Sequence, residues 1–257
     1  MNIARFLPVL VFASLIGAWE WIVRAQSIPP YILPAPSLIM ATLQEDWALL
    51  SASLWVTLRI TALALLLATS IGVALAILFA QWRWLERAVF PIAVILQVTP
   101  IIAIEPLLLV YLDAETAVLA CAFLVAFFPI LSNTALGLSS TDHHLRDLFD
   151  LYGASAWQEM RFLRLPSALP YFLGGLRIAG GLALIGAIAA EIAAGASGQG
   201  AGLAYRIVEA GYRLNIPRMF AALTLISLAG IAIWSVLDFV NRALLAKWHD
   251  SARERSL

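Results

Sequence analysis

Six long apolar runs constrain this chain more than any other feature of its sequence. They cover residues 6–25, 53–81, 86–112, 115–138, 170–196 and 218–246. A transmembrane helix needs about 20 mostly apolar residues, and each of these runs is long enough. Only 12% of the residues are charged, about half the roughly 25% of a soluble domain. The sequence therefore predicts an all-α membrane protein with six transmembrane helices in a single transmembrane domain, residues 1–257.

The first run is interpreted as a retained helix and not as a cleaved signal peptide. Its basic flank is Arg5 alone, and Trp19, Glu20 and Trp21 stand where a cleavage site has small residues. Prolines between the first two runs, at 29, 30, 34 and 36, exclude a helix there. The following LIMATLQEDWALL is predicted to be a short interfacial helix.

Basic residues predict the orientation of the chain. With the N-terminus in the cytoplasm, the inner loops and ends hold about twice as many arginines and lysines as the outer ones. Cytoplasmic loops carry this excess in membrane proteins. Both termini and the polar segment 139–169 are therefore expected on the cytoplasmic side.

This polar segment carries a helical pattern between two apolar runs. Its central part reads DLFDLYGASAWQEMRFLRLPSALP, residues 147–170. Apolar side chains recur at three- and four-residue spacing at Leu145, Leu148, Leu151 and Tyr152, which indicates one face of a helix. Gly153 is expected to break that helix, Ser155 to cap a second one, and Pro166 to end it. The segment is thus predicted to be a knob of two short helices, suited to a soluble partner.

The spacing within the knob resembles the EAA loop of ABC importer permeases, the membrane subunits that work with a solute-binding protein. That pattern has Glu-Ala-Ala, three residues, Gly, nine residues, Ile, one residue and Leu-Pro. Gly153 takes the glycine place, Leu163 the Ile place, and Leu165-Pro166 the Leu-Pro place. The triplet falls on Asp147-Leu148-Phe149, where only the acidic character is kept.

The resemblance extends over nearly the whole chain, which looks like the nitrate, sulfonate and taurine group of these permeases. It is carried by LPAPS (33–37), TLRI (57–60), PIAVILQVTPIIAIEPLLLVYL (91–112), FFPILSNTALGL (127–138), GASAWQEMRFLRLPSALPYFLGGLRIA (153–179) and AAEIAAGASGQGAGLAYRI (189–207). This group is similar to permeases for pyrimidine precursors, riboflavin-like compounds and aromatic acids. Glu105 departs from it, since a small apolar residue is expected there.

The resemblance implies a type I ABC importer (MetI-like) permease fold in a bacterial inner membrane. Two copies would form one pathway, each docking one ABC ATPase subunit, and a periplasmic or lipid-anchored binding protein would deliver the solute. ATP and Mg²⁺ would bind the ATPase and not this chain, and no nucleic acid is implied. The coupling contact would involve Asp147, Gly153, Ala154, Ser155, Trp157, Glu159, Leu163, Leu165 and Pro166.

Missing motifs narrow the alternatives. A P-loop needs a glycine-rich run ending in Gly-Lys, and the only lysine, Lys247, follows Ala246. ATP hydrolysis is therefore expected on another polypeptide. No G-x-S-x-G or H-E-x-x-H supports an intramembrane enzyme. A self-sufficient secondary transporter stays open, and loss of uptake without an ATPase would exclude it.

Cysteine and histidine support no metal site. Cys121 is interpreted as a small buried hydrophobe. His143 and His144 are interpreted as solvated loop residues.

Ionisable residues at membrane depth are functional candidates because they are costly there. The candidate translocation path comprises Arg59, Pro100, Glu105, Arg177 and Glu191. The alternative for Glu105 is a pair with Arg59 or a hydrogen bond to a neighbouring helix. Asp238 is expected to pair with Arg242, four residues away. Glu191 precedes the glycine-rich turn 195–202, a candidate gate or binding-protein contact, which crosslinking from Ser197 would test.

Two questions stay open at this level. Glycines 174, 175, 180, 181 and 186 mark either a pore lining or tight helix packing. Arg59 and Arg177 would suit an anionic solute, whereas Glu105 and Glu191 would not. A sulfonate, taurine or nitrate-like anion is predicted first, with a pyrimidine, riboflavin-like or aromatic metabolite as the alternative.

Overall fold

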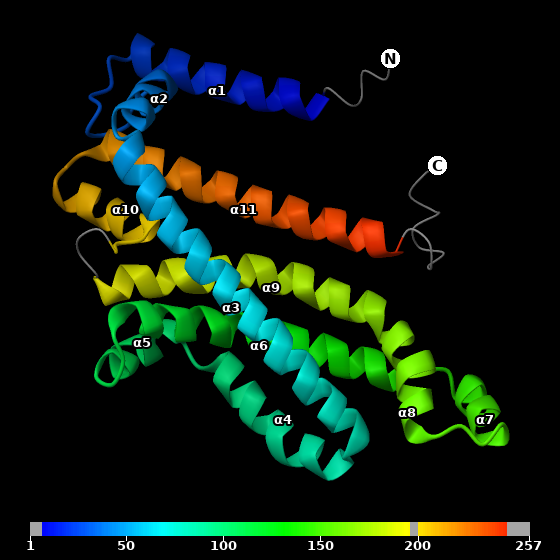
Figure 1. The fold of residues 1–257 in the computed structure, drawn as a ribbon. Helices are drawn as coiled ribbons and strands as arrows, with labels where there is room; N and C mark the ends of the chain where they lie inside the picture. Colours follow the sequence, from blue (N-terminus) through cyan, green and yellow to red (C-terminus); the bar gives the residue numbers. More distant parts are fainter. Residues whose placement is uncertain (1–6, 196–199, 246–257) are drawn as a thin grey trace. The chain divides into compact units, whose positions relative to one another are not determined.

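The computed structural model describes residues 7–195 and 200–245, and within these ranges the chain is helical with short turns. The elements (Figure 1) are α1 (Leu7–Ala25), α2 (Pro36–Glu45), α3 (Trp47–Gln81), α4 (Arg83–Val98), α5 (Ile101–Leu109), α6 (Ala114–Ser139), α7 (His143–Leu151), α8 (Ala156–Glu159), the π-helical turn η2 (Met160–Arg164), α9 (Leu165–Ala194), α10 (Leu203–Tyr212) and α11 (Ile216–Leu245). The all-α prediction is confirmed.

The apolar runs become membrane-length helices. Among the described residues, five helices are long and apolar enough to cross a membrane: α1, α3, α6, the continuous Ala156–Ala194 helix and α11. A sixth span exists if α4 and α5 are taken together. Short α2 covers most of the predicted interfacial segment, but Trp47 already begins α3.

The third predicted span is not one straight helix. Its two halves, α4 and α5, meet at an angle of 96° around Thr99 and Pro100. The residue before a proline is driven from helical to extended backbone, and Thr99 has φ −71° and ψ 127°. Pro106 lies inside α5 without ending it. Pro100 therefore marks a break in the helix, whereas Pro106 does not.

The prediction that Pro166 ends a helix is wrong. The chain stays helical from Ala156 to Ala194, and Pro166 is the second residue of α9. The turn just before it, η2, is wider than an α-helical turn. Proline normally clashes with the carbonyl four residues earlier. We attribute the continuity to η2, because a widened turn relieves that clash.

The chain divides into two compact units. One consists of residues 1–56 and 195–228, and the other of residues 57–194 and 229–257. The first is called the α2–α10 unit and the second the α6–α9 unit. Helices α3 and α11 contribute to both.

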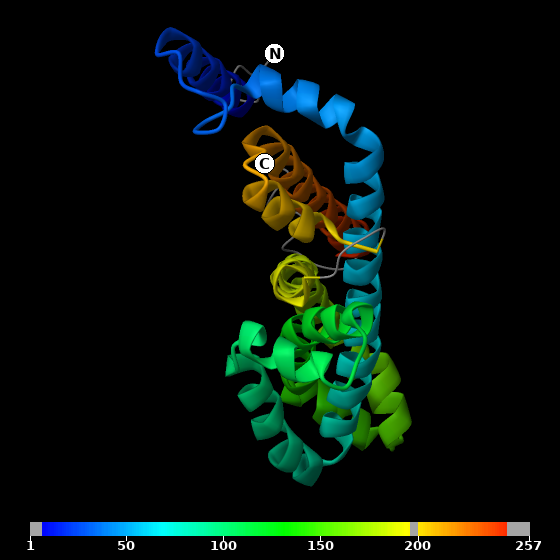
Figure 2. The ribbon, with the colours of Figure 1, turned by 90° about the vertical axis from the view of Figure 1, so that its left-hand side faces the viewer.

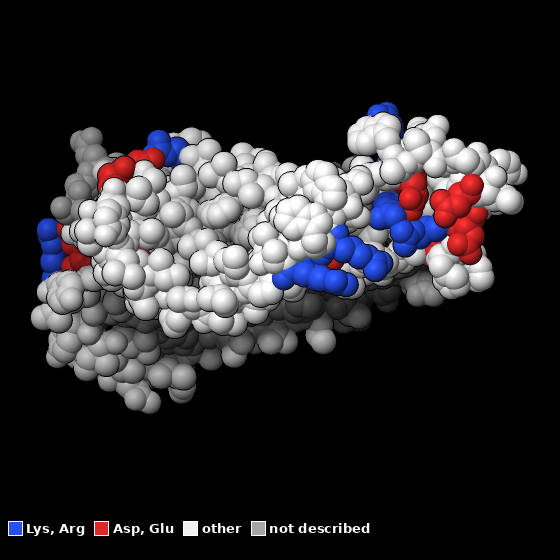
Figure 3. Space-filling view, turned by 90° about the horizontal axis from the view of Figure 1, so that it is seen from below, with Lys and Arg blue, Asp and Glu red and all other residues white. Residues whose placement is uncertain are grey.

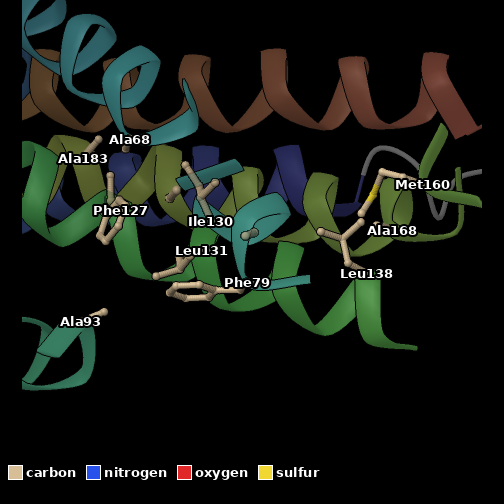
Figure 4. Packing of buried hydrophobic residues seen from close by; sticks show 13 residues of the cluster. Ala68, Phe79, Ala93, Phe127, Ile130, Leu131, Leu138, Met160, Ala168 and Ala183 are labelled. Carbon is tan, nitrogen blue, oxygen red and sulfur yellow. The ribbon is translucent and has the colours of Figure 1, made fainter. Parts of the chain in front are cut away.

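Helices α6 and α9 form the centre of the α6–α9 unit and lie side by side (Figure 1 and Figure 2). Their buried side chains join those of α3 and η2 in one core. Figure 4 shows Phe79 of α3 against Leu131, and Leu138 beside Ala168 and Met160. This core extends to the base of the predicted knob, because Met160 belongs to η2.

Glycines of α9 divide into packed and open positions. A Cβ on Gly175 would lie 2.8 Å from the Pro129 carbonyl oxygen, and one on Gly186 would lie 3.0 Å from the Ala122 Cα, both in α6. Gly174 and Gly181 have open space instead. The sequence left open whether these glycines mark a pore lining or tight helix packing. Gly175 and Gly186 serve close helix packing, whereas Gly174 and Gly181 face away from it.

The α2–α10 unit has its own core. Leu50, Leu203 and Ala222 are buried in it, and Trp19 packs against Phe220 with ring centroids 5.9 Å apart. A two-bond ion pair joins Arg218 to Asp46, with Nε–Oδ2 at 2.6 Å and Nη2–Oδ1 at 2.8 Å. In α10, a hydrogen bond from Arg206 holds the pKa of the Glu209 carboxyl below its ordinary value. Helix α10 itself was not predicted.

Candidate ATPase-coupling surface

Helix α7 begins the knob and has a strongly two-sided character. Asp142 caps it by accepting the His144 backbone N–H at 2.8 Å. Near its end, the side chains of Leu151 and Tyr152 are 83% and 81% exposed. Large apolar groups exposed on an otherwise polar segment are typical of a surface that a partner covers.

Gly153 turns the chain between α7 and α8. Its φ of +66° lies in the left-handed region, which disfavours side chains with a Cβ. The break predicted at this residue is confirmed. A Cβ there would meet no atom within 4 Å, so the requirement for glycine is conformational and not steric.

Ser155 starts α8 with a reciprocal cap. Its hydroxyl accepts the Gln158 backbone N–H at 3.3 Å, and the Gln158 side chain accepts the Ser155 backbone N–H at 2.7 Å. The predicted N-cap is confirmed. Such caps contribute roughly 1 kcal/mol to helix stability, so the start of α8 is well defined.

Glu159 joins the two parts of the knob. Its Oε1 accepts Arg146 Nε of α7 at 3.0 Å and Arg164 Nε of η2 at 2.8 Å. The Glu159 side chain is 16% exposed, and so is that of Arg164. Charge-assisted bonds with little exposure are stronger than surface pairs. This three-residue bridge makes the knob a rigid lever on α9.

The turn at Gly153 is hollowed. A cavity of about 410 Å³ is lined by Leu148, Phe149, Tyr152, Gly153, Ala154, Gln158 and Phe162. Exposed Leu151 and Tyr152 form an apolar rim beside it. We call the cavity and this rim the knob groove. Its walls come from α7 and from the helical turns after Ser155.

The nine predicted coupling residues occupy different depths. Asp147, Gly153, Ser155 and Trp157 are exposed, whereas Ala154, Glu159, Leu165 and Pro166 are half-buried. Leu163 is buried and lies in η2. The structure adds Leu151, Tyr152 and Phe162 as exposed apolar groups. The helical periodicity had marked Leu151 and Tyr152, but nothing in the sequence pattern singled out Phe162.

The two arginines of the candidate path are paired with carboxylates outside the predicted set. Arg59 of α3 pairs with Glu115 of α6, so the alternative pair with Glu105 does not form. Arg177 of α9 pairs with Asp238 at 3.1 Å and stacks on Trp234, with 4.5 Å from its Cζ to the ring centroid. Both arginines therefore hold carboxylate or aromatic partners. Pro100 marks the break between α4 and α5.

The two acidic candidates are buried. Glu105 is 0% exposed, and neither of its carboxyl oxygens has a hydrogen-bond partner among the described residues. Glu191 accepts a hydrogen bond from the Thr57 hydroxyl at 2.7 Å. Asp238 pairs with Arg242, as predicted, and also with Arg177, which was not. Ser197 lies outside the described residues.

Three exposed side chains at the start of α7 lie close enough together to be possible metal ligands, a group that the sequence did not reveal. Ligand atoms of Asp142, His143 and His144 lie within 4.8 Å of one another. Asp142 already caps α7, and all three side chains face solvent. A solvated role for the two histidines fits their exposure.

Comparison with known proteins identifies a shared family. The model for the binding-protein-dependent transport system inner membrane component matches residues 68–249. A formylaminopyrimidine transport permease protein of Halalkalibacterium halodurans is 35% identical over 93% of this chain and 94% of its own length. A riboflavin transport system permease protein of Chloroflexus aurantiacus is 33% identical over 95% and 90%.

Another relative and a solved structure are also transport proteins. A putative aliphatic sulfonates transport permease protein of Bacillus subtilis is 29% identical over 95% of this chain and 87% of its own length. Among solved structures, an amino acid ABC transporter superposes with a TM-score of 0.66 at 17% identity, covering 79% of this chain and 97% of the other. The latter likeness concerns the fold alone.

Proposed function

The chain belongs to the family of binding-protein-dependent transport inner membrane components, and on that basis we propose how it acts as the permease subunit of an ATP-driven importer. It is a multi-pass membrane protein with the fold of ABC importer permeases. The resemblance inferred from the EAA-like spacing is confirmed at the level of the family.

We infer that the knob groove docks a separate ABC ATPase subunit. The single observation that carries this is the exposed apolar rim on a rigid knob, with Leu151 and Tyr152 more than four-fifths exposed beside a cavity of about 410 Å³. The Glu159 bridge ties α7 to η2. A push on the groove would therefore be transmitted through η2 into α9, which continues from it without interruption.

In each transport cycle, the knob transmits movement of the ATPase to the membrane helices. Two copies of the chain form one pathway in a bacterial inner membrane, each with one ATPase subunit that holds ATP and Mg²⁺. Closure of the ATPases on ATP moves both knobs and favours the outward-facing state, which receives solute from the binding protein. Hydrolysis restores the inward-facing state. ATP acts by binding the two states with different affinities.

The solute class favoured here is a small nitrogen heterocycle. The relatives named for formylaminopyrimidine and riboflavin transport are 35% and 33% identical to this chain, against 29% for the one named for sulfonates. The case for an anion rested on the resemblance to the nitrate, sulfonate and taurine group and on Arg59 and Arg177, and both arginines carry a carboxylate partner. A sulfonate, taurine or nitrate-like anion is the second candidate.

Purification from native membranes tests the coupling contact. We expect an ATPase subunit and a binding protein to co-purify with the chain. Changing Leu151 and Tyr152 to Ser should remove the ATPase while the chain stays in the membrane. The matched control is Leu244→Ser, an exposed apolar position on α11 far along the sequence from the knob. Solute uptake in vesicles free of ATP and of any ATPase would overturn the importer mechanism.

A thermal-shift screen on the co-purified binding protein names the solute. Stabilisation by pyrimidines or flavins, and not by sulfonates or nitrate, would support the heterocycle assignment. The reverse pattern would establish the anion.

A further inference from the structure

A cavity of about 510 Å³ lies where α3 ends and α4 begins, away from the knob groove. Four arginines line it: Arg83 and Arg87 of α4, Arg146 of α7 and Arg164 of η2. We call it the arginine cavity. Figure 3 shows arginine side chains, in blue, at several places on the face seen from below, and one group of them lies close together with acidic groups beside it.

Two of the four arginines hold an internal carboxylate and two do not. Arg146 and Arg164 share Glu159. Arg83 and Arg87 are exposed, and the ion pairs among the described residues include neither of them. Glu86 is the one carboxylate among the described lining residues. Even counting Glu86 and Glu159, positive charge predominates, so the cavity favours an anion.

Arg83 and Arg87 are placed to act together. They are four residues apart in the first two turns of α4, so their side chains lie on the same helix face. The N-terminus of a helix carries a partial positive charge and free N–H groups, which reinforce anion binding there. Guanidinium groups match the geometry of phosphate oxygens with paired hydrogen bonds. A phosphate-type group is therefore the chemistry that this cavity fits.

Part of the cavity wall is apolar, and the side chains beside the cavity indicate headgroup depth. Phe79 and Leu138 are buried side chains that contribute to its wall. Beside it, Trp82 and Trp84 are 50% and 68% exposed. Exposed tryptophans mark the boundary between membrane and water, and basic pockets between transmembrane helices at the cytoplasmic boundary bind anionic lipid headgroups.

We propose that the arginine cavity binds the phosphate headgroup of an anionic phospholipid of the cytoplasmic leaflet, held by Arg83 and Arg87. The leaflet follows from the predicted orientation of the chain, whereas the phosphate chemistry does not depend on it. Because Arg146 and Arg164 form the opposite wall and hold Glu159, the bound headgroup lies between α4 and the base of the knob.

Native mass spectrometry of the purified full-length chain tests this directly. The chain in detergent is titrated with phosphatidylglycerol, and bound lipid is counted for wild type and for Arg83→Gln with Arg87→Gln. Each basic residue near an anionic lipid contributes roughly fivefold in affinity, so the double variant should bind about 25-fold more weakly. The charge-matched control is Arg161→Gln with Arg213→Gln, both exposed and outside the cavity, which should bind like wild type.

A second variant and a second probe separate the outcomes. Ser139→Phe fills the cavity mouth without changing charge and should also weaken phosphatidylglycerol binding, with wild-type thermal unfolding in phosphatidylcholine showing that the fold is intact. Calorimetry with inorganic phosphate in phosphatidylcholine nanodiscs tests the other source of the same chemistry. One outcome is that the wild type binds inorganic phosphate, the double variant does not, and neither binds phosphatidylglycerol. That result would support an anion site in the cavity and would contradict a lipid as its ligand.

Equal retention of phosphatidylglycerol by wild type and the double variant, with no phosphate binding, would overturn the proposal. The ATPase plays no part in these measurements. Their failure would therefore leave the importer proposal untouched.

Discussion

At the scale of single residues, the charges at membrane depth are mostly neutralised within the chain. Arg59 is paired with Glu115, and Arg177 lies between Asp238 and Trp234. Glu105 is the exception, since it is fully buried and its oxygens have no partner among the described residues. A buried acid without a partner is costly, and such a cost points to a function.

Glu105→Gln should cut solute uptake about tenfold or more while the chain still assembles and inserts, because the amide keeps the shape of the acid but cannot ionise. Uptake into proteoliposomes containing the whole importer is the measurement. Glu115→Gln is the control, since it breaks an exposed ion pair worth about 0–1 kcal/mol. Normal uptake by Glu105→Gln would show that this residue does not take part in transport.

Neighbouring glycines offer a second residue-scale test. Gly175→Leu should destabilise the α6–α9 unit by about 1–3 kcal/mol or prevent folding, because its Cβ would strike the Pro129 carbonyl. Gly174→Leu, one residue earlier and facing open space, should leave the melting temperature of the purified chain nearly unchanged. Equal melting temperatures for the two variants would contradict the packing described here.

At the scale of elements, the knob and α9 form one continuous lever. Helix continues from α8 through η2 into α9, although proline at 166 favoured an end there. The left-handed turn at Gly153 sets the angle between α7 and α8. Anything that alters this turn should change the groove while leaving both helices intact.

Gly153→Val should weaken association with the ATPase, since a β-branched residue pays roughly 1–2 kcal/mol to stay in the left-handed conformation. Gly153→Asn is the matched variant, because asparagine tolerates this conformation far better. Binding of the purified chain to its ATPase, measured by surface plasmon resonance, should rank wild type, then Asn, then Val. If Asn and Val weaken binding alike, the glycine serves close approach of the ATPase and not the turn.

At the scale of the whole molecule, one face of α9 is exposed in the part of the chain that the structure describes. Ile178 and Ile185 are 54% and 59% exposed, and Gly181 lies between them on the same face with open space above it. Small residues on an open helix face allow close approach of another helix. We expect the second copy of the chain to meet this face, beside the solute path.

Ile185→Cys in a Cys121→Ala background should form a disulfide-linked dimer on oxidation in native membranes. Cys121 is the single cysteine of the sequence, so the new thiol reports alone. Dimer is read from non-reducing gels. Ile231→Cys on α11, which is also exposed, is the control and should crosslink less. Stronger crosslinking from position 231 would place the interface on another face.

The sequence by itself determined the class of this protein and its local turns. Apolar runs of about 20 residues or more permit little besides membrane helices, and five of the six runs became single helices. Gly153 and Ser155 were predictable because a left-handed turn and an N-cap depend on the residue and its immediate neighbours. The spacing from Gly153 to Pro166 was enough to indicate the importer family.

Only the tertiary structure decided which distant groups meet. Arg59 pairs with Glu115 and not with Glu105. Gly175 packs against α6, whereas Gly174 does not. The helix runs through Pro166 but breaks before Pro100, although each proline has one polar and one apolar neighbour in the sequence. These outcomes depend on distances between residues far apart in the chain and on how a turn relaxes against its surroundings. Local propensity carries no information about either, so the arginine cavity and the knob groove became visible only in the folded molecule.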